Sequence, residues 1–304
     1  MIEIQELSKR YRGQTVVDRL SFRAKPGTVT GFLGPNGSGK TTTLRMALGL
    51  ARPDGGHARI NGRRYCDLSY PLRHVGAVLD AGAVHSGRTA RAHLRALALA
   101  NGIAPSRVRD VLGEVGLESV RGDRAGTFSL GMRQRLGIAA ALLGDPEVLI
   151  LDEPINGLDP DGVRWIRELL KSLAGEGRTV LLSSHLMSEM ELTAERIVVI
   201  GRGRLIADTS VAELAGRYSS GVRVRSPRPE ALAAALGEGG AEVAVEPDGA
   251  MTVTEMSIED IAATAAAHGH VLHEVAQRET SLEEAYMQLT ASTAEYRGGV
   301  RDEH

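Results

Sequence analysis

The stretch of sequence that decides the fold class is Gly34-Pro35-Asn36-Gly37-Ser38-Gly39-Lys40-Thr41. It matches the phosphate-loop pattern G-x-x-x-x-G-K-[ST], in which glycines let backbone N–H groups turn inward around phosphate oxygens. The β-branched run Thr28 to Leu33 precedes it and predicts a strand, and Thr41 to Leu50 predicts a helix. This order places the loop at the positively charged end of a helix, where anions bind. The alternative is a Gly-rich strand-to-helix turn without a ligand.

Side chains inside this loop suit a nucleotide. Lys40 is expected to pair with the β- and γ-phosphates, and the Thr41 hydroxyl to ligate Mg²⁺. The predicted nucleotide contacts are the whole loop and the residue after it: Gly34, Pro35, Asn36, Gly37, Ser38, Gly39, Lys40, Thr41 and Thr42. The motif alone does not separate ATPases from GTPases or small-molecule kinases.

An acidic pair follows a second apolar strand. Val148 to Leu151 is a continuous apolar run, which is typical of a strand buried on both faces of a parallel sheet. Asp152 comes directly after it and is expected to hold Mg²⁺ at the strand end. The next residue, Glu153, is expected to take a proton from an attacking water. A solvated strand end without chemistry is the alternative.

The remaining apolar pattern predicts an α/β core with a helical insertion. Val180 to Leu182 is another buried-strand pattern, and Gly162 to Leu173 has helical spacing. From Ala90 to Leu117 apolar residues recur at three and four, with a break at Asn101 to Pro105, which indicates inserted helices. Further strands are predicted at Ile2 to Leu7 and Leu20 to Ala24, and a turn at Asn61-Gly62.

Length and charge predict two domains. The chain has 304 residues, against about 150 for one typical domain. Its net charge is −2, yet residues 1–218 carry 30 Lys and Arg against 23 Asp and Glu, whereas residues 219–304 carry 6 against 15. Near-neutrality therefore hides a first part of charge +7 and a second part of charge −9. We predict domains at 1–218 and 219–292, and a flexible tail at 293–304.

The second part has a βαββαβ order, the split βαβ arrangement of a small, ferredoxin-like α+β domain. Its predicted elements are Val222 to Arg225, Pro229 to Leu236, Ala241 to Val245, Met251 to Glu255, Ser257 to Ala267 and Val271 to Ala276. A last helix is predicted from Ser281 to Leu289, with Ser281 as its N-cap.

Composition excludes several classes of protein. The single cysteine, Cys66, rules out an intrachain disulfide and fits a reducing compartment. No apolar run approaches the ~18 to 20 residues of a spanning helix, and Met1 to Ile4 lacks the features of a signal peptide. With 3% aromatic residues, stacking on nucleic acid is not expected. Strand alternation would scatter His268, His270 and His273, which disfavours a metal cluster there.

Six segments in order resemble the nucleotide-binding subunits of ABC transporters, over residues 1 to about 215. They are Tyr11, the phosphate loop, the signature-like run Phe128-Ser129-Leu130-Gly131-Met132-Arg133-Gln134-Arg135, the acidic pair, the D-loop-like run Asn156-Gly157-Leu158-Asp159, and His185 after Ser183-Ser184. The resemblance implies a P-loop NTPase core with antiparallel β and helical subdomains.

The resemblance also implies roles for these residues. Tyr11 stacks on adenine, Asp159 belongs to the nucleotide site, and His185 contacts the γ-phosphate as a catalytic residue. Ser129 and Gly131 of one subunit close over the ATP bound to the other, in a head-to-tail homodimer. The alternatives are a packing tyrosine, an ordinary helix N-cap at Ser129 and a polar surface histidine.

Hydrolysis of MgATP by such subunits drives a separate integral membrane permease, to which they attach from the cytoplasmic face of the membrane. With its small appended α+β domain and a last helix that contains Leu282 to Tyr286, the chain resembles the ATPases of exporters of the daunorubicin-resistance type. This resemblance implies export of a drug, antibiotic or other hydrophobic compound. The alternatives are a soluble ABC-type ATPase acting on ribosomes or DNA, and a nucleotide-gated scaffold with weak turnover.

Two departures from the family pattern matter. The signature reads Ser-Leu-Gly-Met where Ser-Gly-Gly-Gln is commoner, so that Leu130 adds bulk and Met132 removes an amide. Asp80 stands where the family usually has a glutamine, and it offers an oxygen to Mg²⁺ together with a negative charge near the phosphates.

Overall fold

The computed structural model describes residues 1–80, 82–218, 221–246, 248–278 and 281–295. The chain divides into two compact units, Met1–Val211 and Ala212–His304. The division falls seven residues before the predicted boundary after residue 218, because helix α7 (Val211–Tyr218) groups with the second unit. The predicted tail begins inside helix α10, which runs to Glu295, and residues 296–304 lie outside the described residues.

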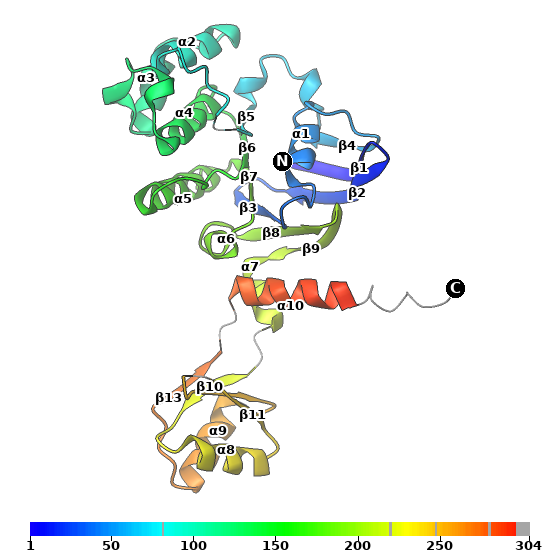
Figure 1. The fold of residues 1–304 in the computed structure, drawn as a ribbon, viewed down its shortest axis with the longest axis vertical. Helices are drawn as coiled ribbons and strands as arrows, with labels where there is room; N and C mark the ends of the chain where they lie inside the picture. The colour runs from blue at the N-terminus through cyan, green and yellow to red at the C-terminus, as the bar shows by residue number, and fades with distance from the viewer. Residues whose placement is uncertain (81, 219–220, 247, 279–280, 296–304) are drawn as a thin grey trace. The chain divides into compact units, whose positions relative to one another are not determined.

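A six-stranded sheet forms the centre of the first unit, which confirms the predicted α/β class (Figure 1). Its strands lie in the order β5 (Val75–Val78), β6 (Val148–Asp152), β7 (Thr179–Ser184), β3 (Thr28–Leu33), β8 (Arg196–Gly201) and β9 (Arg204–Ser210). Neighbouring strands are parallel except for β8 and β9. Every residue of β7 is buried, as the apolar run predicts.

Helices cover both faces of this sheet (Figure 1). On one face, α5 (Pro160–Gly175) packs on β3 and β7, and α6 (Met187–Thr193) packs on β3. On the other face, α1 (Lys40–Ala47) contacts β6 and a second, antiparallel sheet of order β2-β1-β4. Buried side chains from both sheets and from α1 form one hydrophobic core there. The phosphate-loop helix is therefore held between two sheets.

The antiparallel sheet is more extensive than the sequence predicts. Strand β1 (Ile2–Tyr11) and strand β2 (Gln14–Ala24) continue to a tight turn, and β4 (Gly55–Ile60) pairs with β1. Glu6 and Arg19 have φ of 48° and 46°, and the register between β1 and β2 shifts at several points. These irregularities break the alternation from which strand length is predicted. The predicted turn at Asn61-Gly62 is confirmed, with φ of 48° and 79°.

Two helices of the first unit form the insertion predicted over residues 90–117, and a third helix packs against both of them (Figure 1). The first two are α2 (Ala90–Ala100) and α3 (Arg107–Glu114), the third is α4 (Leu130–Leu142), and the three contact one another. Thr89 caps α2 by accepting a hydrogen bond from Ala92 N. Helix α2 ends at Ala100, where the predicted break begins, and the helical insertion is confirmed.

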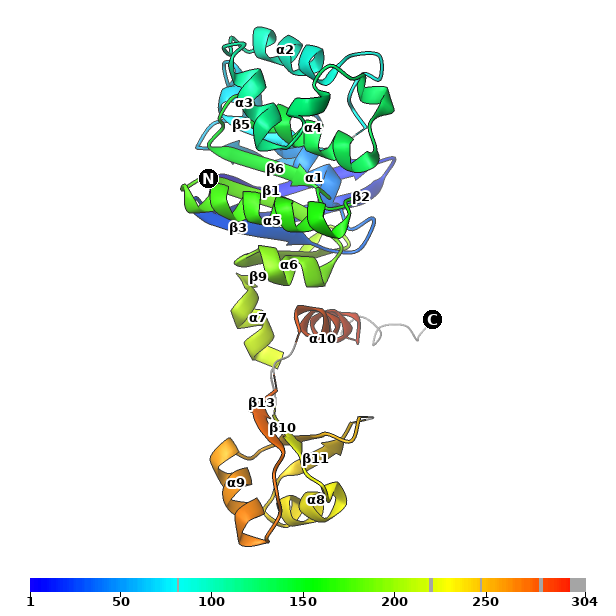
Figure 2. The same cartoon turned by 90° about the vertical axis from the view of Figure 1, so that its left-hand side faces the viewer.

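The second unit has the predicted βαββαβ order (Figure 2). Its elements are β10 (Val222–Arg225), α8 (Pro229–Glu238), β11 (Glu242–Val245), β12 (Met251–Thr254), α9 (Ile258–Ala267) and β13 (Glu274–Gln277). The sheet order is β11-β12-β10-β13, and all its neighbours are antiparallel. Val222 and Val224 are buried in the core of this unit, while Arg223 and Arg225 pair with carboxylates.

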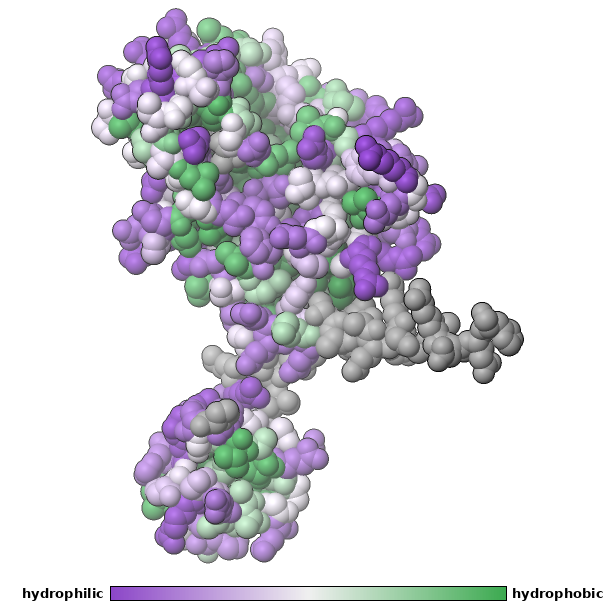
Figure 3. Space-filling view, in the orientation of Figure 1, coloured by the Kyte–Doolittle hydropathy of each residue, from purple (hydrophilic) through white to green (hydrophobic). Residues whose placement is uncertain are grey.

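The last helix, α10 (Leu282–Glu295), begins where it is predicted to begin. Ser281 accepts a hydrogen bond from Glu284 N at 3.2 Å, which confirms its role as N-cap. Among the described residues no helix has both the length and the apolar composition needed to cross a bilayer. In keeping with that finding, polar side chains cover much of the visible face of the first unit (Figure 3).

Candidate nucleotide-binding site

The predicted site residues come together at one edge of the parallel sheet. The carboxyl ends of β3, β6 and β7 lie side by side there, with Asp152 paired to Ser183 and Leu33 paired to Ser184. Each strand delivers a different group to this edge: β3 the phosphate loop, β6 the acidic pair, and β7 His185. Ligands of open α/β sheets bind at this edge of the strands.

Close backbone packing fixes the shape of the phosphate loop. A Cβ at Gly34 would lie 2.5 Å from Ile200 O. Gly39 has φ of 104°, and a Cβ there would lie 2.8 Å from Val16 O. Only glycine fits both positions, because the loop lies directly against the backbones of β2 and β8.

Lys40 is buried at the mouth of this loop, with 6% of its surface exposed. Its Nζ donates to Gly34 O at 2.6 Å and lies 3.6 Å from Glu153 Oε1. The buried hydroxyl of Ser38 has no hydrogen-bond partner among the described residues. A cation and an unpaired hydroxyl in one loop suit the oxygens of a phosphate group.

Oxygen ligands for a metal meet beside the loop. Thr41 Oγ1 donates to Asp152 Oδ2 at 2.7 Å, and Ser183 Oγ donates to Asp152 Oδ1. A hydroxyl and a carboxylate are ligands that Mg²⁺ prefers, so these residues fit the predicted ion. Asp80, the third predicted ligand, is exposed and accepts a hydrogen bond from Gly82 N at 2.7 Å within its own loop. Within the described ranges, no group of three or more His, Cys, Asp and Glu side chains suits a metal.

Glu153 lies at the centre of a polar cluster. Its carboxylate accepts from Asn156 Nδ2 at 3.4 Å, lies 2.8 Å from His185 Nδ1, and also faces Lys40. The structure thus brings together the two residues predicted to be catalytic, Glu153 and His185. Glu153 has φ of 50°, a left-handed backbone that costs a non-glycine residue about 1 to 3 kcal/mol. Such strain is typical of functional positions.

The signature-like run begins helix α4 and is tied to the acidic pair. Ser129 caps the helix by accepting from Met132 N at 3.2 Å. The side chain of Gln134 is buried, and its Nε2 donates to Pro154 O at 2.8 Å. Asp159 caps α5 in the same way, by accepting from Gly162 N at 2.8 Å. The predicted nucleotide roles of Ser129, Gly131 and Asp159 stay predictions, since both caps also serve their own helices.

Leu130, the bulky departure in the signature-like run, lies against the D-loop-like run. Gly157 has φ of 78°, and a Cβ there would lie 2.1 Å from Leu130 Cδ2. Leu158 in turn lies near Gly131, where a Cβ would be 3.5 Å from Leu158 Cδ2. The extra bulk of Leu130 is therefore accommodated by a glycine in the facing loop.

Replacing Gly157 with alanine is expected to lower the free energy of unfolding by about 1 to 2 kcal/mol, since the left-handed backbone disfavours a Cβ and Leu130 occupies its space. Urea unfolding of the full chain measures this. The matched control is Gly113→Ala, in the last turn of α3, where a Cβ meets nothing within 4 Å and stability is not expected to fall. An unchanged unfolding midpoint for Gly157→Ala would contradict the prediction.

Tyr11 stands at the end of β1 and is 46% exposed. Lys9 Nζ lies 5.3 Å from the centre of its ring. The sheet that carries Tyr11 also contacts the phosphate loop, through Val16 of β2. An accessible ring on this sheet is compatible with adenine stacking, which stays a prediction.

Sequence reasoning missed three residues of the site. Ser183, Gln134 and Asn156 stand inside the quoted runs but received no role of their own. Ser183 and Gln134 are polar side chains that the fold buries. The available signal is a polar residue in an apolar context, since most buried polar groups are hydrogen-bonded.

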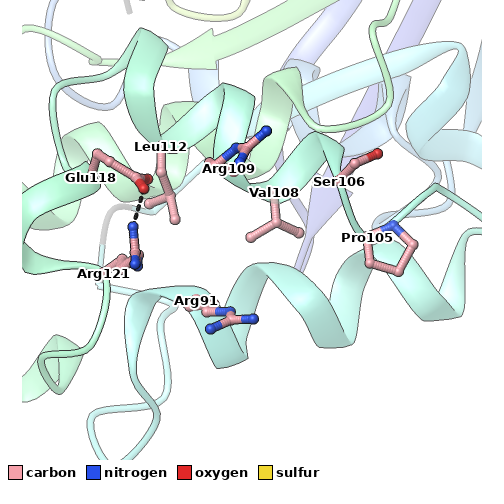
Figure 4. Close-up of a pocket in the computed structure, with 8 residues that line it drawn as sticks. All are labelled: Arg91, Pro105, Ser106, Val108, Arg109, Leu112, Glu118 and Arg121. Atoms are coloured by element: carbon pink, nitrogen blue, oxygen red, sulfur yellow. Dashed lines mark hydrogen bonds and ion pairs between the residues drawn. The ribbon is translucent and has the colours of Figure 1, made fainter.

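A separate pocket lies in the helical insertion, away from the strand ends. It has a volume of about 420 Å³ and is lined by Arg91, Pro105, Ser106, Val108, Arg109, Leu112, Glu118 and Arg121. Figure 4 shows the three arginines around an apolar floor, with Arg121 paired to Glu118. The pocket has no glycine-rich loop and shares no residue with the strand-end cluster.

Comparisons with known proteins identify the family of this chain. A family model described as "ABC transporter" matches residues 17–156, and one described as a domain of unknown function matches residues 220–283. The chain is 44% identical over 209 residues to an uncharacterized ABC transporter ATP-binding protein, YhcH, of Bacillus subtilis (strain 168). That match covers 68% of each chain.

Two further matches extend the comparison. The chain is 42% identical over 217 residues to the bacitracin transport ATP-binding protein BcrA of Enterococcus faecalis, covering 70% of each chain. A solved structure titled as an ATP binding subunit of an ABC transporter matches with a TM-score of 0.66 and 29% identity. This match covers 72% of the present chain and 93% of that one.

Proposed function

Because the chain belongs to the ABC transporter family as an ATP-binding ATPase subunit, we propose that it hydrolyses MgATP at the strand-end cluster and drives export through a separate membrane subunit. The observation that carries this proposal is the meeting of three strand ends. They bring the phosphate loop, the Asp152–Glu153 pair and His185 to one edge of the sheet.

Each residue of the cluster has a task in hydrolysis. The loop N–H groups and Lys40 hold the phosphates of ATP. Glu153 accepts a proton from the water whose oxygen attacks the γ-phosphorus, and the bond from that phosphorus to the bridging oxygen of ADP breaks. His185, 2.8 Å from Glu153, orients this carboxylate and contacts the γ-phosphate. Tyr11 supplies a face for the adenine.

Thr41 and Asp152 are the residues that would hold Mg²⁺. Their oxygen atoms lie 2.7 Å apart and offer the hard ligands that this ion requires. The ion would neutralise charge that develops on the transferring phosphate. Asp80 is proposed as a further oxygen donor to the ion, and its carboxylate would have to share that role with its hydrogen bond from Gly82 N.

The complete site needs a second copy of the chain. Ser129 begins α4, and its hydroxyl and the free N–H groups at this helix end form an anion site. Lys40 already has its own helix terminus, at α1. We therefore propose a head-to-tail homodimer in which Ser129 and Gly131 of one copy close over the ATP held by the other.

The proposal that the transported compound is an antibiotic or another hydrophobic compound is supported by the relative named for bacitracin transport. On this proposal, the chain attaches to the cytoplasmic face of a membrane through its permease. We expect the affinity-tagged full chain, purified in detergent from the organism that encodes it, to retain a polytopic membrane protein in fixed ratio, identified by mass spectrometry. Recovery of ribosomal subunits or DNA without such a protein would favour the soluble alternative.

A further inference from the structure

Ser183 occupies an unusual place beside the acidic pair. It lies in β7, where every residue is buried, and its own exposed fraction is 0%. A hydroxyl in such a strand is unfavourable unless both its donor and its acceptor capacity are used. The partners of Ser183 therefore show what the hydroxyl does.

Both partners of Ser183 belong to the acidic pair. The O–H donates to Asp152 Oδ1, and the same oxygen accepts from Glu153 N at 3.0 Å. A serine hydroxyl has one hydrogen to donate and two lone pairs, so the two bonds are compatible and have a fixed direction. The chain of bonds runs from the Glu153 backbone through Ser183 to the Asp152 carboxylate.

The position of Ser183 explains how the strand end turns. Asp152 is the last residue of β6 paired with β7, and its partner is Ser183. One residue later the backbone of Glu153 takes a left-handed conformation, with φ of 50°. The Glu153 N–H donates to the Ser183 side chain and not to the backbone of the neighbouring strand. The hydroxyl thereby continues the pairing for one residue while the backbone changes direction.

This turn sends the Glu153 side chain to Lys40 and His185. The Asp152 carboxylate is fixed at the same time, since Thr41 holds Oδ2 while Ser183 holds Oδ1. One buried hydroxyl is thus bonded to the Asp152 carboxylate and to the backbone N–H of Glu153, the two residues of the acidic pair.

We propose that Ser183 is a positioning residue that sets the orientation of the Asp152 carboxylate and of the Glu153 backbone through these two hydrogen bonds. The inference rests on the proposed function, because it assigns Ser183 a role through Glu153 and Asp152. Small displacements of catalytic groups cost as much as a hundredfold in rate.

The test measures MgATP turnover and ATP affinity of the purified full chain. For Ser183→Ala we expect kcat to fall about ten- to a hundredfold while the Kd for ATP changes less than about threefold. For Ser183→Thr, which keeps the hydroxyl on a β-branched side chain suited to a strand, we expect kcat within about threefold of the parent. If Ser183 had a purely structural role, Ser183→Ala would lower kcat and the affinity for ATP together. Ser183→Thr would then change the two quantities together as well.

The matched control is Thr30→Val on the neighbouring strand β3. Thr30 is 1% exposed, and its hydroxyl has no hydrogen-bond partner among the described residues. Its replacement removes a buried hydroxyl of the same sheet without touching the acidic pair, and kcat is expected to be unchanged. If the alanine variant does not fold, Ser183→Cys replaces it, because a thiol fills the space but is a weak donor and acceptor.

Two outcomes would overturn the inference: parental kcat in Ser183→Ala, or a folded Ser183→Thr no more active than the alanine or cysteine variant. Failure of the proposed function has a different signature. In that case the parent chain itself hydrolyses no ATP, or Glu153→Gln turns over at the parental rate, whatever the Ser183 variants do.

Discussion

Replacing Lys40 with alanine is expected to weaken ATP binding by about two orders of magnitude, equivalent to about 2.7 kcal/mol. A unit charge about 4 Å from a phosphate contributes on the order of 4 kcal/mol at an effective dielectric near 20, before desolvation is subtracted. Because Lys40 is already buried by the protein, with its Nζ bonded to Gly34 O, part of that desolvation is complete before ATP arrives. Isothermal titration calorimetry with ATP and Mg²⁺ measures the change in Kd.

A control has to show that the loss of affinity comes from the position of Lys40 and not from the removal of any one positive charge. Lys171→Ala provides the control, since this lysine is exposed on α5, away from the strand ends. We expect its Kd for ATP to equal that of the parent. If Lys40→Ala bound ATP as tightly as Lys171→Ala, the nucleotide would have to bind elsewhere than at the phosphate loop.

The sequence predicts this part of the site well because the whole loop motif lies in one continuous stretch of sequence, Gly34 to Thr41. At Gly34 and Gly39 the backbone of another strand lies too close for any side chain, so glycine is required. The strand before the loop and the helix after it have clear hydrophobic patterns. The buried strands β6 and β7 are predicted for the same reason, since continuous apolar runs indicate burial on both faces.

Other parts of the fold depend on pairing between distant segments. Strands β8 and β9 form a hairpin at the edge of the sheet, and the pairing of β8 with β3 joins residues more than 160 positions apart. The register between β1 and β2 shifts at several points, so their hydrophobic pattern does not show how long these strands are. In the second unit the strand predicted at Val271 to Ala276 is β13, Glu274–Gln277, because its pairing with β10 decides its bounds.

The contacts within the site also depend on register. Glu153 and His185 are 32 residues apart in sequence, and they meet because β6 and β7 pair Asp152 with Ser183. A shift of two residues in that register would keep the same faces buried yet separate the two side chains. The apolar patterns and the family resemblance therefore identified the candidates, and the sheet determined which of them touch.

Replacing Glu153 with glutamine is expected to slow ATP turnover by about 10² to 10⁴ while leaving ATP bound. Glutamine has the shape of glutamate and still bonds to Asn156 and His185, but its amide takes no proton from water. Since Lys40 Nζ lies 3.6 Å from Glu153 Oε1, the substitution also frees Lys40 from a competing negative charge. The Kd for ATP should therefore stay the same or fall, the opposite of the result expected for Lys40→Ala.

The same variant tests the head-to-tail homodimer, because slow hydrolysis prolongs the ATP-bound state that holds two copies together. With ATP and Mg²⁺, size-exclusion chromatography with light scattering should show Glu153→Gln as a dimer, and with ADP as a monomer. Glu168→Gln, an exposed position on α5, is the control and should hydrolyse ATP at the parental rate. Parental turnover in Glu153→Gln would disprove its role as the base. A slow variant that stays monomeric with ATP would keep that role but contradict the shared site, since Ser129 and Gly131 of a second copy would then be unnecessary for binding.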